Sequence, residues 1–254
     1  MNRRHMLKVL GGGALALTGL ESLRQLPALA EVAKTPTPAL TGSPGLLPLS
    51  FEPTRLSGLS ARLLTSHHQN NYGGAVKRLG QIHSQLQALP ATAAPFQVGA
   101  LKREELIATN SILLHERYFE QLGAFHGPDG LLLKALEIQF GGFTDWLLSF
   151  KHLALSLAGG SGWALLYHHP VLGRFQTVAA TEHSVGLAGG QILLALDMYE
   201  HAYHLDFGAD AKSYIEAFFH HLDWRVVAHR YQKALVIADL LKSPSAAVGL
   251  QSSS

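Results

Sequence analysis

Hydrophobic residues recur at helical spacing through the first half of the chain. They fall on one face of a long helix over 59–89, which Pro90 ends. Gly73-Gly74 weakens helicity inside this run, so we expect a bend or a close contact there. A loop is expected over 91–99, and a second helical pattern occupies 102–122. This half therefore predicts a hairpin of two long helices.

The second half changes period. Helical patterns are followed by a strand pattern, a Pro/Gly turn and two more strand patterns, and then helix returns. The expected strands are 162–169, 174–178 and 191–196, and the expected helices are 129–139, 143–157, 214–221 and 225–241. We predict an α+β fold with an N-terminal long-helix hairpin domain over 47–125. A C-terminal domain over 126–242 holds a small three-stranded antiparallel sheet flanked by helices.

The two ends do not fit this fold. Residues 1–30 begin with Arg3-Arg4, continue into a short apolar stretch and end with Ala28-Leu29-Ala30, as in a signal peptide of the twin-arginine type. The stretch is shorter than the ~20 residues that a membrane span needs, although an uncut anchor stays open. Residues 31–46 are predicted to be a flexible lead-in and 243–254 a disordered tail. We expect a periplasmic or secreted bacterial protein, free of the membrane after signal cleavage.

Charge and cysteine content restrict the chemistry. Of 20 Lys and Arg and 18 Asp and Glu, four basic residues and one acidic residue lie in the predicted signal, leaving 16 against 17. A net charge this close to zero does not suggest a surface that binds nucleic acid. The chain has no cysteine. Disulfides and thiolate chemistry are thus excluded, and nitrogen and oxygen atoms must hold any metal.

The strongest chemical signal is the stretch 197–204. Asp197 and His201 stand four residues apart, directly after the apolar run 192–196. A carboxylate and an imidazole at the end of a buried element are typical metal ligands.

This stretch reads Asp-Met-Tyr-Glu-His-Ala-Tyr-His, which resembles the signature Asp-x-Trp-Glu-His-Ala-Tyr-Tyr of iron/manganese superoxide dismutases. Tyr199 stands for the Trp, and His204 for the second Tyr. Weaker similarities lie at 140–143, 160–163 and 214–224, and the resemblance spans 47–230. It implies the two-domain plan of that family, with Asp197 and His201 as metal ligands.

Two further histidine ligands are implied upstream. Family landmarks at Ser60-Ala61, Val76 and Leu79 point to His67 as the first. His68 stays an alternative, because one residue of helix turns a side chain by about 100° and only one of the pair can point inward.

The second implied ligand is His115. Alone, a histidine between Leu114 and Glu116 would more often be an interior residue than a ligand; the order of all four favours a ligand. The resemblance also makes His183 the residue that hydrogen-bonds solvent beside the metal, although it could be an ordinary loop histidine. Ser111, at the other family position for this role, is too short.

The resemblance implies a homodimer. Glu200 would reach the last ligand of the partner subunit across a two-fold axis, and His204 and Trp163 would support the site. An exposed Glu200 without this role is the simpler alternative.

The substrate entrance departs from the family. Ala75 replaces the gateway Tyr, and Asn71 replaces the gateway His. Tyr72, four residues after His68, is the candidate for a tyrosine that still lines the entrance.

The resemblance implies a superoxide dismutase with one iron or manganese ion per subunit, which converts superoxide to oxygen and hydrogen peroxide. Two alternatives stay open: a non-catalytic structural relative, or a metal enzyme acting on another oxygen or peroxide substrate.

Overall fold

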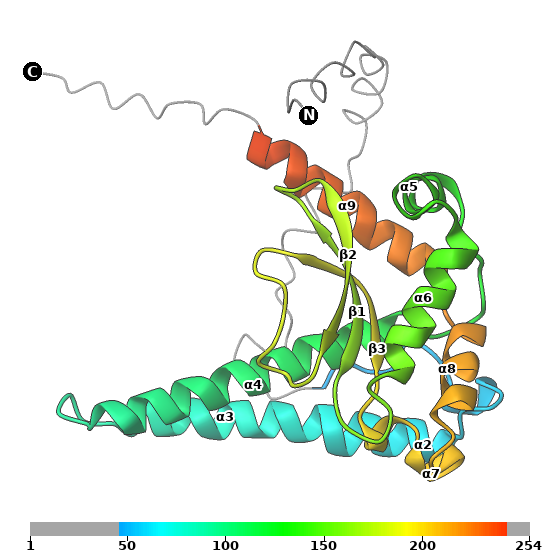
Figure 1. The fold of residues 1–254 in the computed structure, drawn as a ribbon. Helices are drawn as coiled ribbons and strands as arrows, with labels where there is room; N and C mark the ends of the chain where they lie inside the picture. The colour runs from blue at the N-terminus through cyan, green and yellow to red at the C-terminus, as the bar shows by residue number, and fades with distance from the viewer. Residues whose placement is uncertain (1–45, 243–254) are drawn as a thin grey trace, which may run out of the picture. The chain divides into compact units, whose positions relative to one another are not determined.

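The helical hairpin and the small sheet are both present in the computed structural model, which describes residues 46–242 (Figure 1). All of the described residues belong to one compact unit. The predicted signal peptide, the lead-in as far as residue 45 and the tail from 243 lie outside the described residues. The α+β fold class is confirmed.

The first predicted helix is a continuous run of three segments. After the short turn η2 (Pro53–Arg55) come α2 (Ala61–Ser66), the π-helix η3 (His67–Tyr72) and α3 (Gly73–Ala88). The second long helix, α4 (Pro95–Glu120), packs along α3 to close the hairpin (Figure 1). The bend expected at the glycine pair is thus a wider helical turn that ends at Tyr72.

The loop predicted over 91–99 is too long, because α4 already begins at Pro95. Proline suits the first turn of a helix, where its missing N–H is not needed. The Gln97 side chain also accepts a hydrogen bond from the Ala94 N–H at 3.2 Å. These end contacts decide the start of the helix, although the residues that follow lack a clear apolar period.

The C-terminal part begins with α5 (Gly130–Phe140) and α6 (Phe143–Leu155). Its antiparallel sheet has the order β2-β1-β3, and the strands are β1 (Trp163–His169), β2 (Arg174–Ala180) and β3 (Gln191–Asp197). Trp163 pairs with Ala180 on one side and with Asp197 on the other. The register therefore brings Trp163 and Asp197 side by side at one end of the sheet.

Four helical segments complete the fold: η4 (Glu200–Ala202), α7 (His204–Phe207), α8 (Ala211–His220) and α9 (Trp224–Lys242). Helices α4 and α9 pack on β3, and α6 packs on β1 and β2. One hydrophobic core joins the hairpin to the sheet, so α4 and the end of β3 share a buried interior. Among the described residues, none of the helices combines the length and apolarity of a membrane span.

Gly162 allows the close approach at the start of β1. Its φ is 148°, and a Cβ there would lie 2.5 Å from the Ala180 carbonyl oxygen. Its own carbonyl accepts the Met198 N–H at 2.9 Å. Only glycine fits at this point, which ties β1 to the residue after Asp197.

Candidate metal centre

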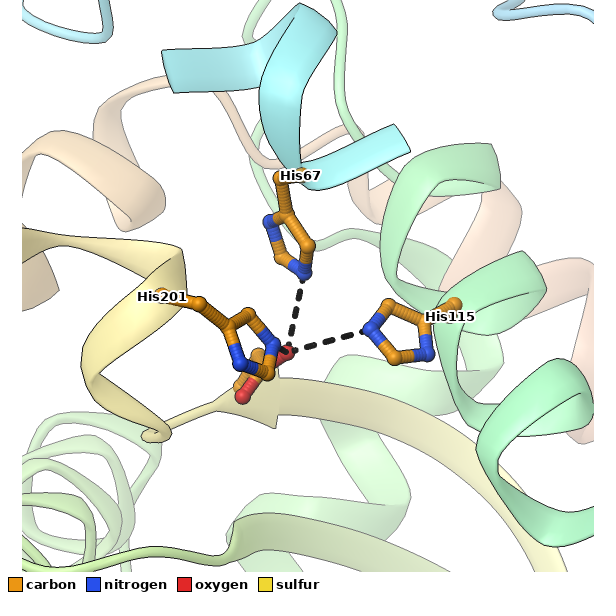
Figure 2. Close-up of side chains that lie close together, drawn as sticks. His67, His115 and His201 are labelled. Atoms are coloured by element: carbon orange, nitrogen blue, oxygen red, sulfur yellow. Dashed lines mark hydrogen bonds and ion pairs between the residues drawn. The ribbon is translucent and has the colours of Figure 1, made fainter. Parts of the chain in front are cut away.

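Four side chains from four elements converge in the interior. His67 comes from η3, His115 from α4, Asp197 from the end of β3 and His201 from η4. Their candidate ligand atoms all lie within 4.8 Å of one another. Figure 2 shows the three imidazoles pointing toward one another. These are the four residues that the sequence predicted as ligands; we call them the histidine–aspartate cluster.

The spacing of the histidine–aspartate cluster fits one metal ion. Oδ2 of Asp197 lies 3.0 Å from Nε2 of His67, 3.1 Å from Nε2 of His201 and 3.6 Å from Nε2 of His115. Nitrogen and oxygen ligands about 2.0–2.2 Å from a metal stand roughly 3–4 Å from each other.

Asp197 is buried as an anion. Burial alone would raise its pKa, but His201 and His67 hold the pKa of Asp197 well below its ordinary value. Its other oxygen accepts the Tyr199 N–H at 2.9 Å, and its backbone carbonyl accepts the Tyr214 hydroxyl at 2.8 Å. These contacts fix the carboxylate with one oxygen directed at the imidazoles.

Two of the imidazoles are buried and neutral. Burial lowers the pKa of His67, and it lowers the pKa of His115 to about 3. The Nδ1–H of His115 donates to the Ser111 carbonyl at 2.7 Å, so its Nε2 carries a lone pair. That Nε2 is buried, has no hydrogen-bond partner within the described region and faces a carboxylate oxygen. Facing lone pairs repel unless a cation lies between them, so the residues fit a metal.

The π-helix decides between His67 and His68. The Gly73 N–H bonds to the His68 carbonyl five residues back, which widens the turn by one residue. His67 points into the cluster, whereas a ring nitrogen of His68 lies 2.7 Å from the Leu47 carbonyl. Such wide turns occur often at functional sites.

A cavity of about 370 Å³ reaches the cluster from the surface. It contacts His115, His201 and His183, and the rest of its wall is small or polar except for Ile107. That wall consists of Asn70, Asn71, Gly74, Ala75, Arg78, Ile107, Ala108 and Ser111. A larger cavity of about 970 Å³ around Phe51 and Arg225 touches none of the cluster residues, so it is not the route to the cluster.

Tyr72 is not among the residues that line this cavity. It is buried, and its hydroxyl accepts the Leu47 N–H at 3.1 Å and donates to Glu116 at 2.9 Å. Its ring stacks on His115 with centroids 6.3 Å apart. The structure therefore places Tyr72 behind a cluster histidine, while Ala75 occupies the entrance.

The four residues predicted to support the cluster differ in burial. Trp163 is fully buried, with its ring edge-on to His115 at 5.2 Å. His183 stacks on Tyr199 at 4.8 Å, and its ring centroid is 6.2 Å from that of His115. Glu200 is exposed directly beside His201. His204, at the start of α7, is also exposed.

Sequence reasoning missed two contacts of this site. The Tyr199 hydroxyl lies 3.1 Å from Nδ1 of His183, and the Asn110 side chain donates to the His183 carbonyl at 2.6 Å. Tyr199 stands where the family signature has Trp, and this difference was the sequence signal for the first contact. No pattern pointed to Asn110.

The chain is similar in sequence to proteins of known family. The model of "Iron/manganese superoxide dismutases, C-terminal domain" matches residues 128–230, which include Asp197 and His201. "Superoxide dismutase [Fe]" of Cupriavidus metallidurans is 49% identical over 189 residues, which cover 74% of this chain and 96% of that protein. The chain belongs to the iron/manganese superoxide dismutases. This membership confirms the resemblance seen in the sequence.

More distant superoxide dismutases are named for either metal. "Superoxide dismutase [Mn]" of Haloarcula marismortui is 33% identical, covering 76% of this chain and 96% of its own length. "Superoxide dismutase [Fe]" of Aquifex aeolicus is 30% identical, covering 76% and 93%. Relatives of both kinds therefore match most of this superoxide dismutase sequence.

Proposed function

We propose that this protein dismutates superoxide at a single iron or manganese ion held by His67, His115, Asp197 and His201. The observation that carries this proposal is the histidine–aspartate cluster: three imidazoles and one carboxylate lie at ligand spacing, at the inner end of a cavity. The names of the relatives support the same reaction.

The bound metal would supply a couple between the divalent and trivalent states. That couple would let one superoxide give up an electron and leave as oxygen, and a second take up an electron and two protons and leave as peroxide. The Asp197 anion would favour the more positive state of a bound metal, because its charge is buried and unscreened. An imidazole that binds the metal through a ring lone pair would add no charge.

The donor set suits either metal. Imidazole and carboxylate bind iron and manganese, and they also bind zinc, which has no accessible redox couple. Zinc-loaded protein is therefore a control with a filled site and no electron transfer.

Rapid mixing with superoxide tests the proposal. Protein loaded separately with iron, manganese and zinc is compared, together with an Asp197→Asn variant. We expect fast decay with iron, manganese or both, the uncatalysed rate with zinc, and loss of catalysis in the variant. Equal decay with all three metals, or none with iron and manganese in protein shown to hold them, would overturn the proposal.

We also propose a homodimer with Glu200 and His204 at its interface. Both are exposed beside His201, as a contact across a two-fold axis requires. Light scattering should give twice the chain mass, and Glu200→Ala should weaken the association. A monomer at micromolar concentration would contradict this arrangement.

Export by the twin-arginine route is proposed from residues 1–30 alone. Replacing Arg3-Arg4 by Lys-Lys should retain the protein in the cytoplasm of a bacterial host. Unchanged distribution between the cell fractions would refute this route.

The small residues at the cavity wall favour a second candidate. Gly74 and Ala75 leave room for a substrate larger than superoxide, such as a peroxide. The products formed from superoxide distinguish the two functions.

A further inference from the structure

His183 is held from two sides at the edge of the metal centre. It lies on the segment between β2 and β3, where Asn110 of α4 donates to its carbonyl at 2.6 Å. Its ring lies flat against Tyr199, with an interplanar angle of 22°. The backbone and the ring are thus anchored by different elements, which leaves the imidazole little freedom to turn.

The Tyr199 hydroxyl has one proton to donate and two lone pairs to accept with. Nδ1 of His183 lies 3.1 Å from this oxygen. A phenol O–H is a better hydrogen-bond donor than acceptor, because its oxygen lone pair is delocalised into the ring, and a bare imidazole nitrogen is a good acceptor. Tyr199 therefore directs its proton to Nδ1 of His183.

This direction of donation determines which nitrogen of His183 carries hydrogen. A neutral imidazole has a single N–H, and Nδ1 is the acceptor, so the proton lies on Nε2. That Nε2 is buried and has no hydrogen-bond partner among the described residues. The ring also lines the cavity that reaches His115 and His201. The free N–H is therefore available to an oxygen-containing molecule in the metal centre.

We propose that Tyr199 is a positioning residue, which holds His183 in the Nε2–H tautomer and so makes it a hydrogen-bond donor toward the metal centre. This inference deepens the proposed function and rests on it.

Nitrogen NMR tests the tautomer directly. In zinc-loaded, ¹⁵N-labelled protein, protonated and bare imidazole nitrogens have separate signals, and a His183→Gln variant assigns those of His183. We expect hydrogen on Nε2 alone in the wild type, and mixed or reversed tautomers in Tyr199→Phe. Tyr203→Phe is the matched control, because its hydroxyl contacts the Gly159 N–H at 3.4 Å. It should leave the His183 signals unchanged. Hydrogen on Nδ1 in the wild type, or one unchanged tautomer in Tyr199→Phe, would overturn the proposal.

The midpoint potential of iron-loaded protein is the second readout. The Nε2–H of His183 would stabilise the more negatively charged form of an oxygen ligand, which accompanies the oxidised metal. Tyr199→Phe loses this donor and should therefore raise the midpoint potential. In a His183→Gln background, the same change should leave the potential unmoved, because an amide has no tautomers. Equal shifts in both backgrounds would contradict an action through His183. Neither readout needs turnover, so failure here is distinguishable from absence of dismutation.

Discussion

At the residue scale, burial and backbone contacts set the protonation of the metal centre. The Ser111 carbonyl fixes the hydrogen of His115 on Nδ1, and burial keeps the pKa of this ring at about 3. The Tyr199 N–H and two imidazoles keep Asp197 ionised. A proton on His115 would block its binding nitrogen, so the same groups that prepare the centre make it sensitive to acid.

The lowered pKa of His115 predicts acid lability of metal-free protein. The unfolded chain binds a proton near pH 6.5, whereas the folded chain binds it only near pH 3. The contribution of His115 to the free energy of unfolding is therefore fully present above pH 6.5. It is lost as the pH falls toward 3, by up to about 1.4 kcal/mol per pH unit.

Urea unfolding at several pH values measures this slope. His115→Gln should flatten it, and exposed His204→Gln should not. A slope unchanged by His115→Gln would show that the ring is already protonated in the folded protein.

At the element scale, the π-helix His67–Tyr72 places the first histidine of the cluster. Its extra residue lets His67 face inward while the next residues reach other partners: His68 lies against the Leu47 carbonyl and Tyr72 bonds the Leu47 N–H. The residues after the lead-in are thereby bonded to the helix that carries His67. Gly73 lies against the same region, because a Cβ there would be 3.3 Å from Leu46 Cδ1.

The neighbouring glycines should differ when replaced by alanine. A Cβ at Gly74 meets nothing within 4 Å, so Gly74→Ala should stabilise the protein by about 0.5–1 kcal/mol through helix propensity. At Gly73 the same gain is offset by the tight contact with Leu46. Urea midpoints of the two variants give the difference, and an equal gain at both positions would show that the Leu46 contact carries no cost.

At the scale of the whole molecule, a buried arginine joins α9 to the hairpin and to the sheet. Arg230 donates to the Leu193 carbonyl of β3 at 2.9 Å and to the Arg117 carbonyl of α4 at 2.9 Å. It also donates to Gln121 at 3.1 Å, and this amide oxygen accepts the Ala195 N–H at 3.3 Å. The network lies behind β3, which ends at Asp197.

Arg230→Leu should therefore destabilise the protein by about 3 kcal/mol, because it leaves buried acceptors without donors. It should also weaken metal retention, since β3 carries Asp197. Exposed Arg225→Leu is the matched control and should change the urea midpoint little. A near-wild-type midpoint for Arg230→Leu would show that water replaces the guanidinium.

The sequence was most informative where ligand-type residues lie on elements with a regular hydrophobic pattern. The motif at 197–204 indicated Asp197 and His201, and landmark spacing favoured His67, because ligand sets need fixed places on buried elements. The start of α4 at Pro95 depends on end contacts, which have no period. The choice between His67 and His68 depends on a π-helix, and helical periodicity assumes regular turns. The hydrogen bonds of His183 with Tyr199 and Asn110 join distant segments, so they required the structure.

The product balance of superoxide consumption tests the central claim most directly. Iron- or manganese-loaded protein is mixed with a known amount of superoxide, and oxygen and hydrogen peroxide are both measured. Dismutation at the histidine–aspartate cluster predicts one oxygen and one peroxide for every two superoxide ions consumed, at a rate well above that of zinc-loaded protein. Peroxide formed without oxygen, one for each superoxide, would contradict the claim and indicate a metal centre that only reduces its substrate.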